Sequence, residues 1–354
     1  MKTVPDNLIL NMNMNPYVVV IGGANMDIGG LSQKPLLKRD SNPGSVRMSM
    51  GGVGCNIAHN LALLEVPVTL LTAVGDDLYG KRIQADCEKV GIDLQKARIV
   101  QGAATSTYLY ICDSDGELYA AVNDMSICDR ITPEYIREHL LYINEAGAVV
   151  MDANLPEETI AYIGENVKSP LFADPVSAVK APKLFPYMNR IHTLKPNRAE
   201  AEILSGIKMT NEADIKKAGC ALVEKGVKEV FISLGKEGVF TAVAQTKHQD
   251  CAAHDGEKTA SCDQTGCGLI DTRIFSRMDA VSVQNATGAG DAFMAALVYG
   301  FLQHNQLEQR VSFAQAAAVL AIESEETINP QLSVNHIRAK MAEMKENKRR
   351  NFHE

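Results

Sequence analysis

The sequence predicts an α/β protein with a doubly wound, mostly parallel sheet and a second, smaller β-sheet. From residue 148 onward, short apolar runs alternate with helix-like segments, which is typical of parallel strands connected by helices. A further apolar run near the N-terminus ends in a glycine turn, as a buried first strand would. The expected strands cover residues 17–23, 148–151, 171–174, 191–194 and 230–234.

The smaller sheet is predicted from two extended segments in the N-terminal half. Residues 107–111 and 118–122 are rich in tyrosine and aliphatic side chains, and Asp113-Ser114-Asp115-Gly116 between them is a hairpin turn. Residues 31–50 contain two prolines and do not read as a helix. We expect residues of about 28–50 and 104–124 to form a separate sheet that covers the glycine turns.

The chain is expected to hold one large domain, residues 17–341, between a polar leader (1–16) and a charged tail (342–354). Residues 244–277 break the strand–helix pattern and are too long for an ordinary connection. Cys251, Cys262 and Cys267 lie there with two histidines, but their spacing fits no zinc template. We expect a solvated, irregular insertion.

Composition narrows the class of partner. The net charge is −8 and no long basic run precedes the last ten residues, which argues against nucleic acid. No apolar run is long enough to span a bilayer, and the polar N-terminus lacks the build of a signal peptide. Eight cysteines without such a peptide favour reduced thiols in the cytoplasm.

The most informative segment is Asn285-Ala286-Thr287-Gly288-Ala289-Gly290-Asp291, which runs directly into an apolar helix. Glycines let backbone amides converge, and a helix N-terminus adds partial positive charge, so the loop is suited to an anion. An aspartate beside it would repel a free phosphate. It could instead take the proton from a hydroxyl that attacks a phosphoryl group. The simpler alternative is an acid that stabilises the first helical turn.

Three further segments fit the same chemistry. Asn25 and Asp27 follow the first strand, where α/β folds place ligand-binding groups, although turn formers alone would explain them. Asn197 and Glu200 have the spacing of a capping box, or could position a hydrated Mg²⁺ beside nucleotide phosphates. The Ser233-Leu234-Gly235-Lys236-Glu237-Gly238 turn allows close approach of a nucleotide.

In this order, with the Gly-Gly-x₃-Asn motif that ends at Asn56, these segments resemble the ribokinase-like (PfkB) family of small-molecule kinases over about residues 17–341. The resemblance implies a Rossmann-like α/β domain with a small β-sheet lid. Several phrases are closest to the subgroup that phosphorylates the C-nucleoside pseudouridine. They are Asn42-Pro43-Gly44, Gly51-Gly52-Val53-Gly54-Cys55-Asn56-Ile57-Ala58, Val122-Asn123-Asp124-Met125, Ala173-Asp174-Pro175-Val176-Ser177, His192-Thr193-Leu194-Lys195-Pro196-Asn197-Arg198 and Asn285.

The resemblance implies transfer of a phosphoryl group from ATP to the ribose 5′-hydroxyl of this nucleoside. Asp291 would be the base, and the amides of Gly288, Ala289 and Gly290 would form the anion hole. Mg²⁺ would bridge the ATP phosphates and reach Asn197 and Glu200 through water. The implied substrate-binding residues are Asn25, Asp27, Gly51, Gly52, Asn56, Thr107, Asn123 and Asp124, and the implied nucleotide-binding residues are Asn197, Ser233, Gly235, Gly238 and Thr287.

Several points stay open at the level of sequence. Another nucleoside or sugar could be the acceptor, and the fold could serve a non-catalytic nucleoside sensor, although such a binder has no use for Asp291. Activation by a monovalent cation such as K⁺ and assembly into a homodimer through the exposed lid edges are compatible with the sequence. Cys55 stands where some relatives have a basic residue, which affects either a contact at the site or local packing.

Overall fold

The computed structural model describes residues 16–245, 270–275 and 287–351. Its centre is a nine-stranded sheet in the order β15-β14-β13-β12-β11-β10-β1-β4-β6. All neighbouring strands are parallel except at one edge, where β14 pairs antiparallel with both β13 and β15. The strands are β1 (Val18–Ile21), β4 (Val68–Leu71), β6 (Ile92–Asp93), β10 (Ala148–Asp152), β11 (Leu171–Asp174), β12 (Thr193–Leu194), β13 (Glu229–Ser233), β14 (Val239–Ala244) and β15 (Ile270–Phe275).

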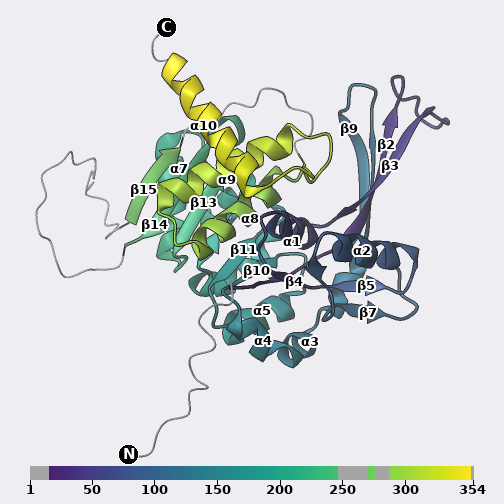
Figure 1. Cartoon of the computed structure of the whole chain (residues 1–354), viewed down its shortest axis with the longest axis horizontal. Helices are drawn as coiled ribbons and strands as arrows, with labels where there is room; N and C mark the ends of the chain where they lie inside the picture. Colours follow the sequence, from purple (N-terminus) through teal and green to yellow (C-terminus); the bar gives the residue numbers. More distant parts are fainter. Residues whose placement is uncertain (1–15, 246–269, 276–286, 352–354) are drawn as a thin grey trace, which may run out of the picture.

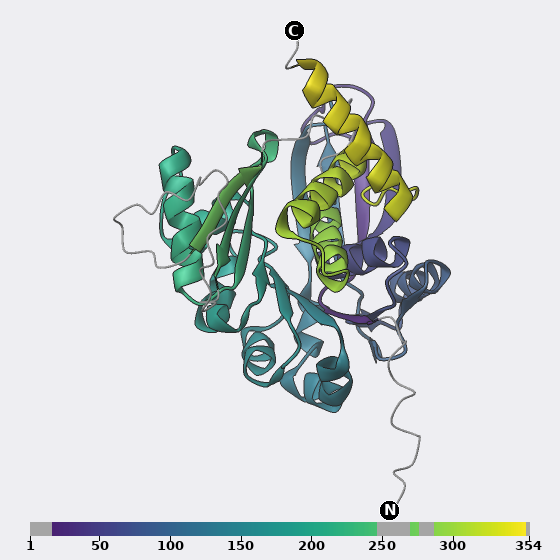
Figure 2. The same cartoon turned by 60° about the vertical axis from the view of Figure 1, so that its left-hand side comes forward.

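Helices cover both faces of this sheet (Figures 1 and 2). One hydrophobic cluster joins it to α1, α2, α8, α9 and α10, and a second joins its other face to α3 to α7. The fold class predicted from sequence, a doubly wound, mostly parallel sheet, is therefore confirmed. The helices are α1 (Val53–Leu63), α2 (Leu78–Lys89), α3 (Pro133–Glu138), α4 (Leu140–Glu145), α5 (Glu157–Asn166), α6 (Arg198–Ser205), α7 (Glu212–Glu224), α8 (Ala289–Leu302), α9 (Leu307–Ile322) and α10 (Val334–Asn351).

The position of β1 in the sheet indicates where a ligand would bind. β1 is completely buried and pairs in parallel with β4 on one side and β10 on the other. The chain therefore builds the sheet outward in opposite directions from β1, and loops diverge at the carboxyl end of this strand pair. Open α/β sheets bind ligands at such a switch point.

The second sheet has the order β3-β2-β8-β9 and stands away from the main body (Figure 1). Its strands are β2 (Asn25–Ser32), β3 (Gly44–Gly51), β8 (Thr107–Cys112) and β9 (Leu118–Asp124). The predicted hairpin turn closes with a hydrogen bond from the Gly116 amide to the Asp113 carbonyl (2.9 Å). The small separate sheet expected from the sequence is thus present, and we call it the lid.

Parts of the architecture escaped prediction. Strand β4 has a threonine among three aliphatic residues and was not assigned. The two-residue β6 gives less signal still. Residues 270–275 were expected to be irregular, but they form β15, which extends the sheet by pairing with β14. The remaining insertion residues 246–269 and 276–277, with their cysteines, and the leader residues 1–15 lie outside the described residues. The charged tail continues α10 as far as Asn351.

No helix in the described part of the chain is long and apolar enough to cross a membrane.

A buried ion pair joins the sheet to α9 at the edge away from the carboxyl ends of the strands. Arg310 donates to both carboxylate oxygens of Glu229, at 2.8 and 2.6 Å. Both residues are less than one tenth exposed. The Nδ1 atom of His192 lies 4.0 Å from the same carboxylate.

We expect Arg310→Met to lower the free energy of unfolding by about 3–5 kcal/mol, because it leaves the Glu229 carboxylate buried without its partner. Urea unfolding at neutral pH measures the loss. The double variant Arg310→Met, Glu229→Gln should recover much of it, because the uncompensated charge is gone. Equal stability of the single and double variants would contradict this explanation.

Candidate active site

The predicted Gly288–Asp291 segment forms the start of α8. Gly288 is the N-cap residue with φ of 83°, and a Cβ there would lie 2.0 Å from the carbonyl oxygen of Thr327. Glycine is therefore required at this position for both backbone conformation and space. Asp291 lies in the first turn and is 8% exposed. Residues 285 and 286 of the same motif lie outside the described residues.

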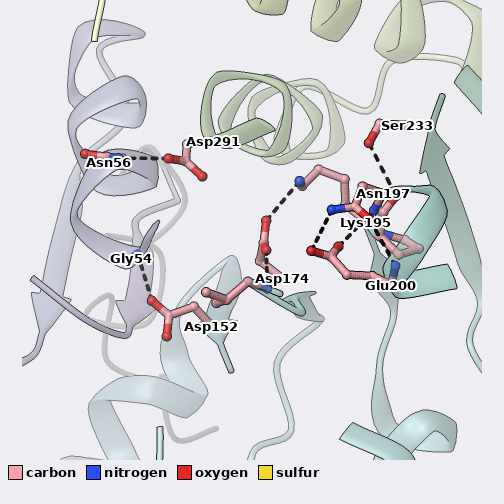
Figure 3. Close-up of polar contacts among 11 residues, drawn as sticks. Gly54, Asn56, Asp152, Asp174, Lys195, Asn197, Glu200, Ser233 and Asp291 are labelled. Atoms are coloured by element: carbon pink, nitrogen blue, oxygen red, sulfur yellow. Dashed lines mark hydrogen bonds and ion pairs between the residues drawn. The ribbon is translucent and has the colours of Figure 1, made fainter. Parts of the chain in front are cut away.

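The carboxylate of Asp291 is held by a residue far away in the sequence. Asn56, on α1, donates its side-chain amide to Asp291 Oδ2 at 2.9 Å (Figure 3). The other polar atom of that amide, Asn56 Oδ1, is buried and has no hydrogen-bond partner among the described residues. It is free to accept a hydrogen bond, for example from a ligand hydroxyl beside Asp291.

The environment of Asp291 tunes its acidity. Burial is the largest cause, and together with the nearby Asp174 carboxylate it raises the pKa of Asp291 to about 7. The hydrogen bond from Asn56 and the charge of Lys195 act in the opposite direction. A carboxylate with a pKa near neutrality suits a general base, because it can both accept a proton and release it.

Lys195 brings a positive charge to the anion-binding loop. It follows β12 and forms a buried ion pair with Asp174 at the end of β11, with 3.0 Å between Nζ and Oδ2. A Cβ on Gly290 would lie 3.1 Å from the same Nζ, so the ammonium group lies against the loop. Burial alone would lower the pKa of Lys195, but Asp174, Asp291 and Glu200 outweigh it and raise the pKa. Lys195 therefore stays charged.

Asp152 ties the glycine turns together. This fully buried carboxylate ends β10 and accepts hydrogen bonds from the amides of Gly23 (2.9 Å) and Gly54 (2.8 Å). A Cβ on Gly22 would lie 2.5 Å from Asp152 Oδ2, which explains the glycine there. Sequence reasoning missed Asp152, and it did not assign site roles to Asp174 and Lys195. The available signal was a charged residue directly after each buried strand.

Asn25 and Asp27 lie where the lid leaves the main body. Asn25 donates to Asp27 Oδ1 at 2.6 Å, and burial raises the pKa of Asp27 to about 6 in spite of that bond. A Cβ on Gly51 would lie 2.4 Å from the Asp27 carboxylate. Gly52 has φ of 98°, and its Cβ would meet the Gly23 carbonyl at 2.5 Å. The predicted substrate residues Asn25, Asp27, Gly51 and Gly52 are thus in one cluster.

The lid residues predicted to approach a base divide between two faces. Asp27 pairs in register with Tyr108, and Tyr108 with Asn123, so these three side chains share one face. Thr107 pairs with Asp124 one position along, which places both on the opposite face. The Asp124 carboxylate instead accepts hydrogen bonds from the Ser126 amide (3.0 Å) and hydroxyl (2.7 Å). The structure does not bring Thr107 and Asp124 to the side occupied by Asp27.

The predicted nucleotide-binding residues lie along the carboxyl ends of β12 and β13. Asn197 and Glu200 form the complete capping box, with side-chain-to-amide distances of 2.8 and 3.0 Å, and their side chains also contact each other at 2.8 Å. Ser233 and the Pro196 carbonyl lie 3.5 Å apart beside them (Figure 3). Gly235 and Gly238 have φ of 59° and 102° and form the turn before β14.

Thr287 is exposed, at the entrance to the α8 loop. Glu200 is buried, and burial raises its pKa in spite of the Asn197 hydrogen bonds. Within the described ranges there is no group of three or more His, Cys, Asp or Glu side chains that could hold a metal ion by itself.

Comparison with known proteins shows which family has this sequence and fold. The model of the pfkB family of carbohydrate kinases matches residues 15–334. The chain belongs to the pfkB family. A pseudouridine kinase of Escherichia coli is 38% identical over 92% of this chain and 96% of its own length. The uncharacterized sugar kinase YeiI of the same organism is 35% identical over 90% of this chain and 82% of its own length.

The solved structures agree on the fold. Ribokinase of Arabidopsis thaliana in complex with ribose and ATP superposes with a TM-score of 0.75 at 24% identity, over 93% of this chain and 99% of that one. This chain is therefore a carbohydrate kinase of the pfkB family, that is, a phosphotransferase with an alcohol group as acceptor, and it has the ribokinase-like fold.

Proposed function

We propose that this pfkB kinase transfers the γ-phosphoryl group of ATP to the ribose 5′-hydroxyl of pseudouridine. The observation that carries the proposal is the buried Asp291 held by Asn56 beside the glycine loop, with a pKa raised to about 7. The 38% identity to the E. coli pseudouridine kinase over nearly its whole length supports the choice of nucleoside. The 35% identity to a sugar kinase makes another acceptor on the same scaffold the alternative to test.

In the proposed reaction Asp291 takes the proton of the 5′-hydroxyl as its oxygen bonds to the γ-phosphorus. The bond from that phosphorus to the β,γ-bridging oxygen breaks, and ADP leaves. The amides of Gly288, Ala289 and Gly290 and the ammonium of Lys195 stabilise the charge on the transferring group. A positioned general base contributes about 10²–10⁴-fold.

ATP would lie along Asn197, Ser233 and the Gly235–Glu237 turn, with Gly238 and Thr287 at its margins. Mg²⁺ would neutralise part of the charge on the nucleotide phosphates. The side chains of Glu200 and Asn197 already bind each other, so they would hold Mg²⁺ through water molecules and not by direct contact. On the sugar, Asn25, Asp27 and the acceptor atom of Asn56 would bind hydroxyl groups.

The nucleobase of the substrate would lie against the face of the lid that carries Asp27. Asn123 and Tyr108 lie on this face, so the proposal assigns recognition of the base to Asn123 and not to Thr107 or Asp124. Pseudouridine offers one more ring N–H than uridine. A side-chain amide can accept that hydrogen bond and so favour pseudouridine over uridine.

Purified protein with Mg-ATP should release ADP in the presence of pseudouridine and much less with uridine, inosine, adenosine, ribose or fructose. Parallel reactions with and without K⁺ test the monovalent cation. Preference for another member of the panel would replace the acceptor and leave the kinase mechanism intact. If no member of the panel supports ADP release, the proposed class of acceptor is wrong.

The rate should depend on the protonation of Asp291. We expect kcat/KM for the nucleoside to fall about tenfold per pH unit below about pH 7, because only the carboxylate accepts a proton. Asp291→Asn should lose about 10²–10⁴-fold in kcat and show no such limb. Full activity of this variant would exclude Asp291 as the general base.

Folding provides an independent control for the same variant. The pKa of Asp291 is raised above its ordinary value of 3.8, so its contribution to stability is present below about pH 4 and lost as pH rises through 7. Asp291→Asn should therefore gain stability relative to the unchanged chain between pH 5 and pH 8, as measured by urea unfolding. A loss of activity caused by unfolding would not show this gain.

Asn123→Ala should reduce the preference for pseudouridine over uridine by about tenfold, the effect of one hydrogen bond, with the KM for ATP unchanged. Asp124→Ala is the matched control, because its side chain lies on the opposite face of the same strand. Steady-state kinetics with both nucleosides separate the two variants. Equal loss of nucleoside and ATP affinity in Asn123→Ala would argue against the assignment.

A further inference from the structure

The Cys87 sulfur contacts the sulfur atoms of two residues that flank the Gly51-Gly52 turn in the sequence. Cys55 Sγ on α1 lies 4.0 Å from Cys87 Sγ on α2, and Cys87 Sγ lies 3.4 Å from Met50 Sδ at the end of β3. Both cysteines are free and completely buried. Cys55 is the residue that departs from the motif of some relatives, and the proposed reaction gives it no task.

The spacing matches that of a three-coordinate metal centre. At the zinc–sulfur bond length of about 2.3 Å, three sulfur ligands arranged trigonally lie about 4.0 Å apart, and around a larger cation they lie slightly further apart. The two thiols already have this separation, and the flexible side chain of Met50 can adjust to it. Thiolate and thioether ligands together select soft cations. A thioether as third donor also distinguishes this group from clusters of His, Cys, Asp or Glu alone, none of which occurs in the described ranges.

Charge favours a divalent cation in this position. The surroundings are apolar, and the carboxylates of Asp27 and Asp86 act on the Cys55 thiol. A divalent cation that displaces one proton from each thiol gives a neutral complex, M²⁺ + 2 RSH → M(SR)₂ + 2 H⁺. A neutral complex avoids the cost of leaving a net charge in a buried site.

Disulfide formation is the competing chemistry. It requires an external oxidant and begins with a thiolate. The two Sγ atoms lie 4.0 Å apart, so a disulfide would also require them to approach to about 2.05 Å. A cation needs neither the oxidant nor this approach, because coordination displaces the thiol proton, which is released to the solvent.

We propose that Met50, Cys55 and Cys87 form a binding site for one thiophilic divalent d¹⁰ cation of the Cd²⁺ and Hg²⁺ type, and that occupancy inhibits the kinase. Met50 directly precedes Gly51, and Cys55 directly precedes Asn56, whose amide holds Asp291. Met50 Sδ and Cys87 Sγ lie 3.4 Å apart and must separate to about 4.0 Å around the ion. This separation moves the end of β3 and the start of α1 that follows it, and with them the side chain that positions the carboxylate.

The test uses Cd²⁺ and the full chain with Cys251, Cys262 and Cys267 replaced by serine, so that the insertion cannot compete. Direct titration should show one tight site per chain, release of two protons and thiolate-to-metal charge-transfer absorbance in the ultraviolet. Cys87→Ala should weaken binding by at least about 10-fold, since even residues that only support a ligand contribute 10–100-fold. Met50→Leu should weaken it as well, with both thiols retained.

Cys220→Ala, on α7, is the matched control and should bind Cd²⁺ as tightly as the parent chain. After incubation with Cd²⁺ and removal of free metal, kinase activity should fall in the parent and in Cys220→Ala but persist in Cys87→Ala. Basal activity and thermal unfolding without metal establish that each variant is folded, with Cys87→Val as a second choice that fills more of the space.

Equal Cd²⁺ affinity in the parent, Cys87→Ala and Met50→Leu would overturn the site. So would the absence of a tight site in the parent. Tight binding without loss of activity would overturn the inhibitory coupling. Formation of a Cys55–Cys87 disulfide with a mild oxidant, in a chain that does not bind Cd²⁺, would replace the metal site by a redox pair.

Discussion

The buried carboxylate of Asp152 connects two glycine turns of the candidate active site. Burial of a charge is costly unless hydrogen-bond donors replace the lost water. Here the amides of Gly23, Gly54 and Asn154 supply them, at 2.8 to 2.9 Å. Because two of these donors belong to separate glycine turns, one carboxylate connects the end of β1 to the start of α1. That connection sets where α1 points, and therefore where Asn56 meets Asp291.

The candidate site places two carboxylates, Asp174 and Asp291, beside one ammonium group, that of Lys195. Burial and the charge of Asp174 raise the pKa of Asp291, while Lys195 limits the rise and neutralises part of the pocket. The same lysine lies against the loop whose amides would receive the phosphoryl group. An ATP polyphosphate approaching several carboxylates needs this compensation, which the loop amides, Lys195 and a nucleotide-bound Mg²⁺ together would supply.

Strand geometry decides which lid side chains share the face of Asp27. Side chains alternate between the two faces of a strand, so a shift of one residue decides whether a group can face the substrate. Asn123 shares the Asp27 face, whereas Asp124 does not and instead binds Ser126. At the base of the lid, Met50 packs against Cys87 behind the Gly51 turn. The proposed sugar-binding residue Asp27 and the sulfur cluster thus both adjoin the turn at Gly51.

Short sequence patterns were enough to predict several strands, one turn and one loop of this structure. Apolar runs predicted five strands of the main sheet, turn residues predicted the hairpin, and the glycine-rich loop predicted the start of α8 and the place of Asp291. The sequence also predicted the capping box of Asn197 and Glu200, because it is a contact between residues three positions apart. The Asn56–Asp291 bond spans 235 positions, and the Asp152 and sulfur contacts likewise join distant elements. Such contacts depend on how helices and strands pack, which no local pattern records, so only the tertiary structure decided them.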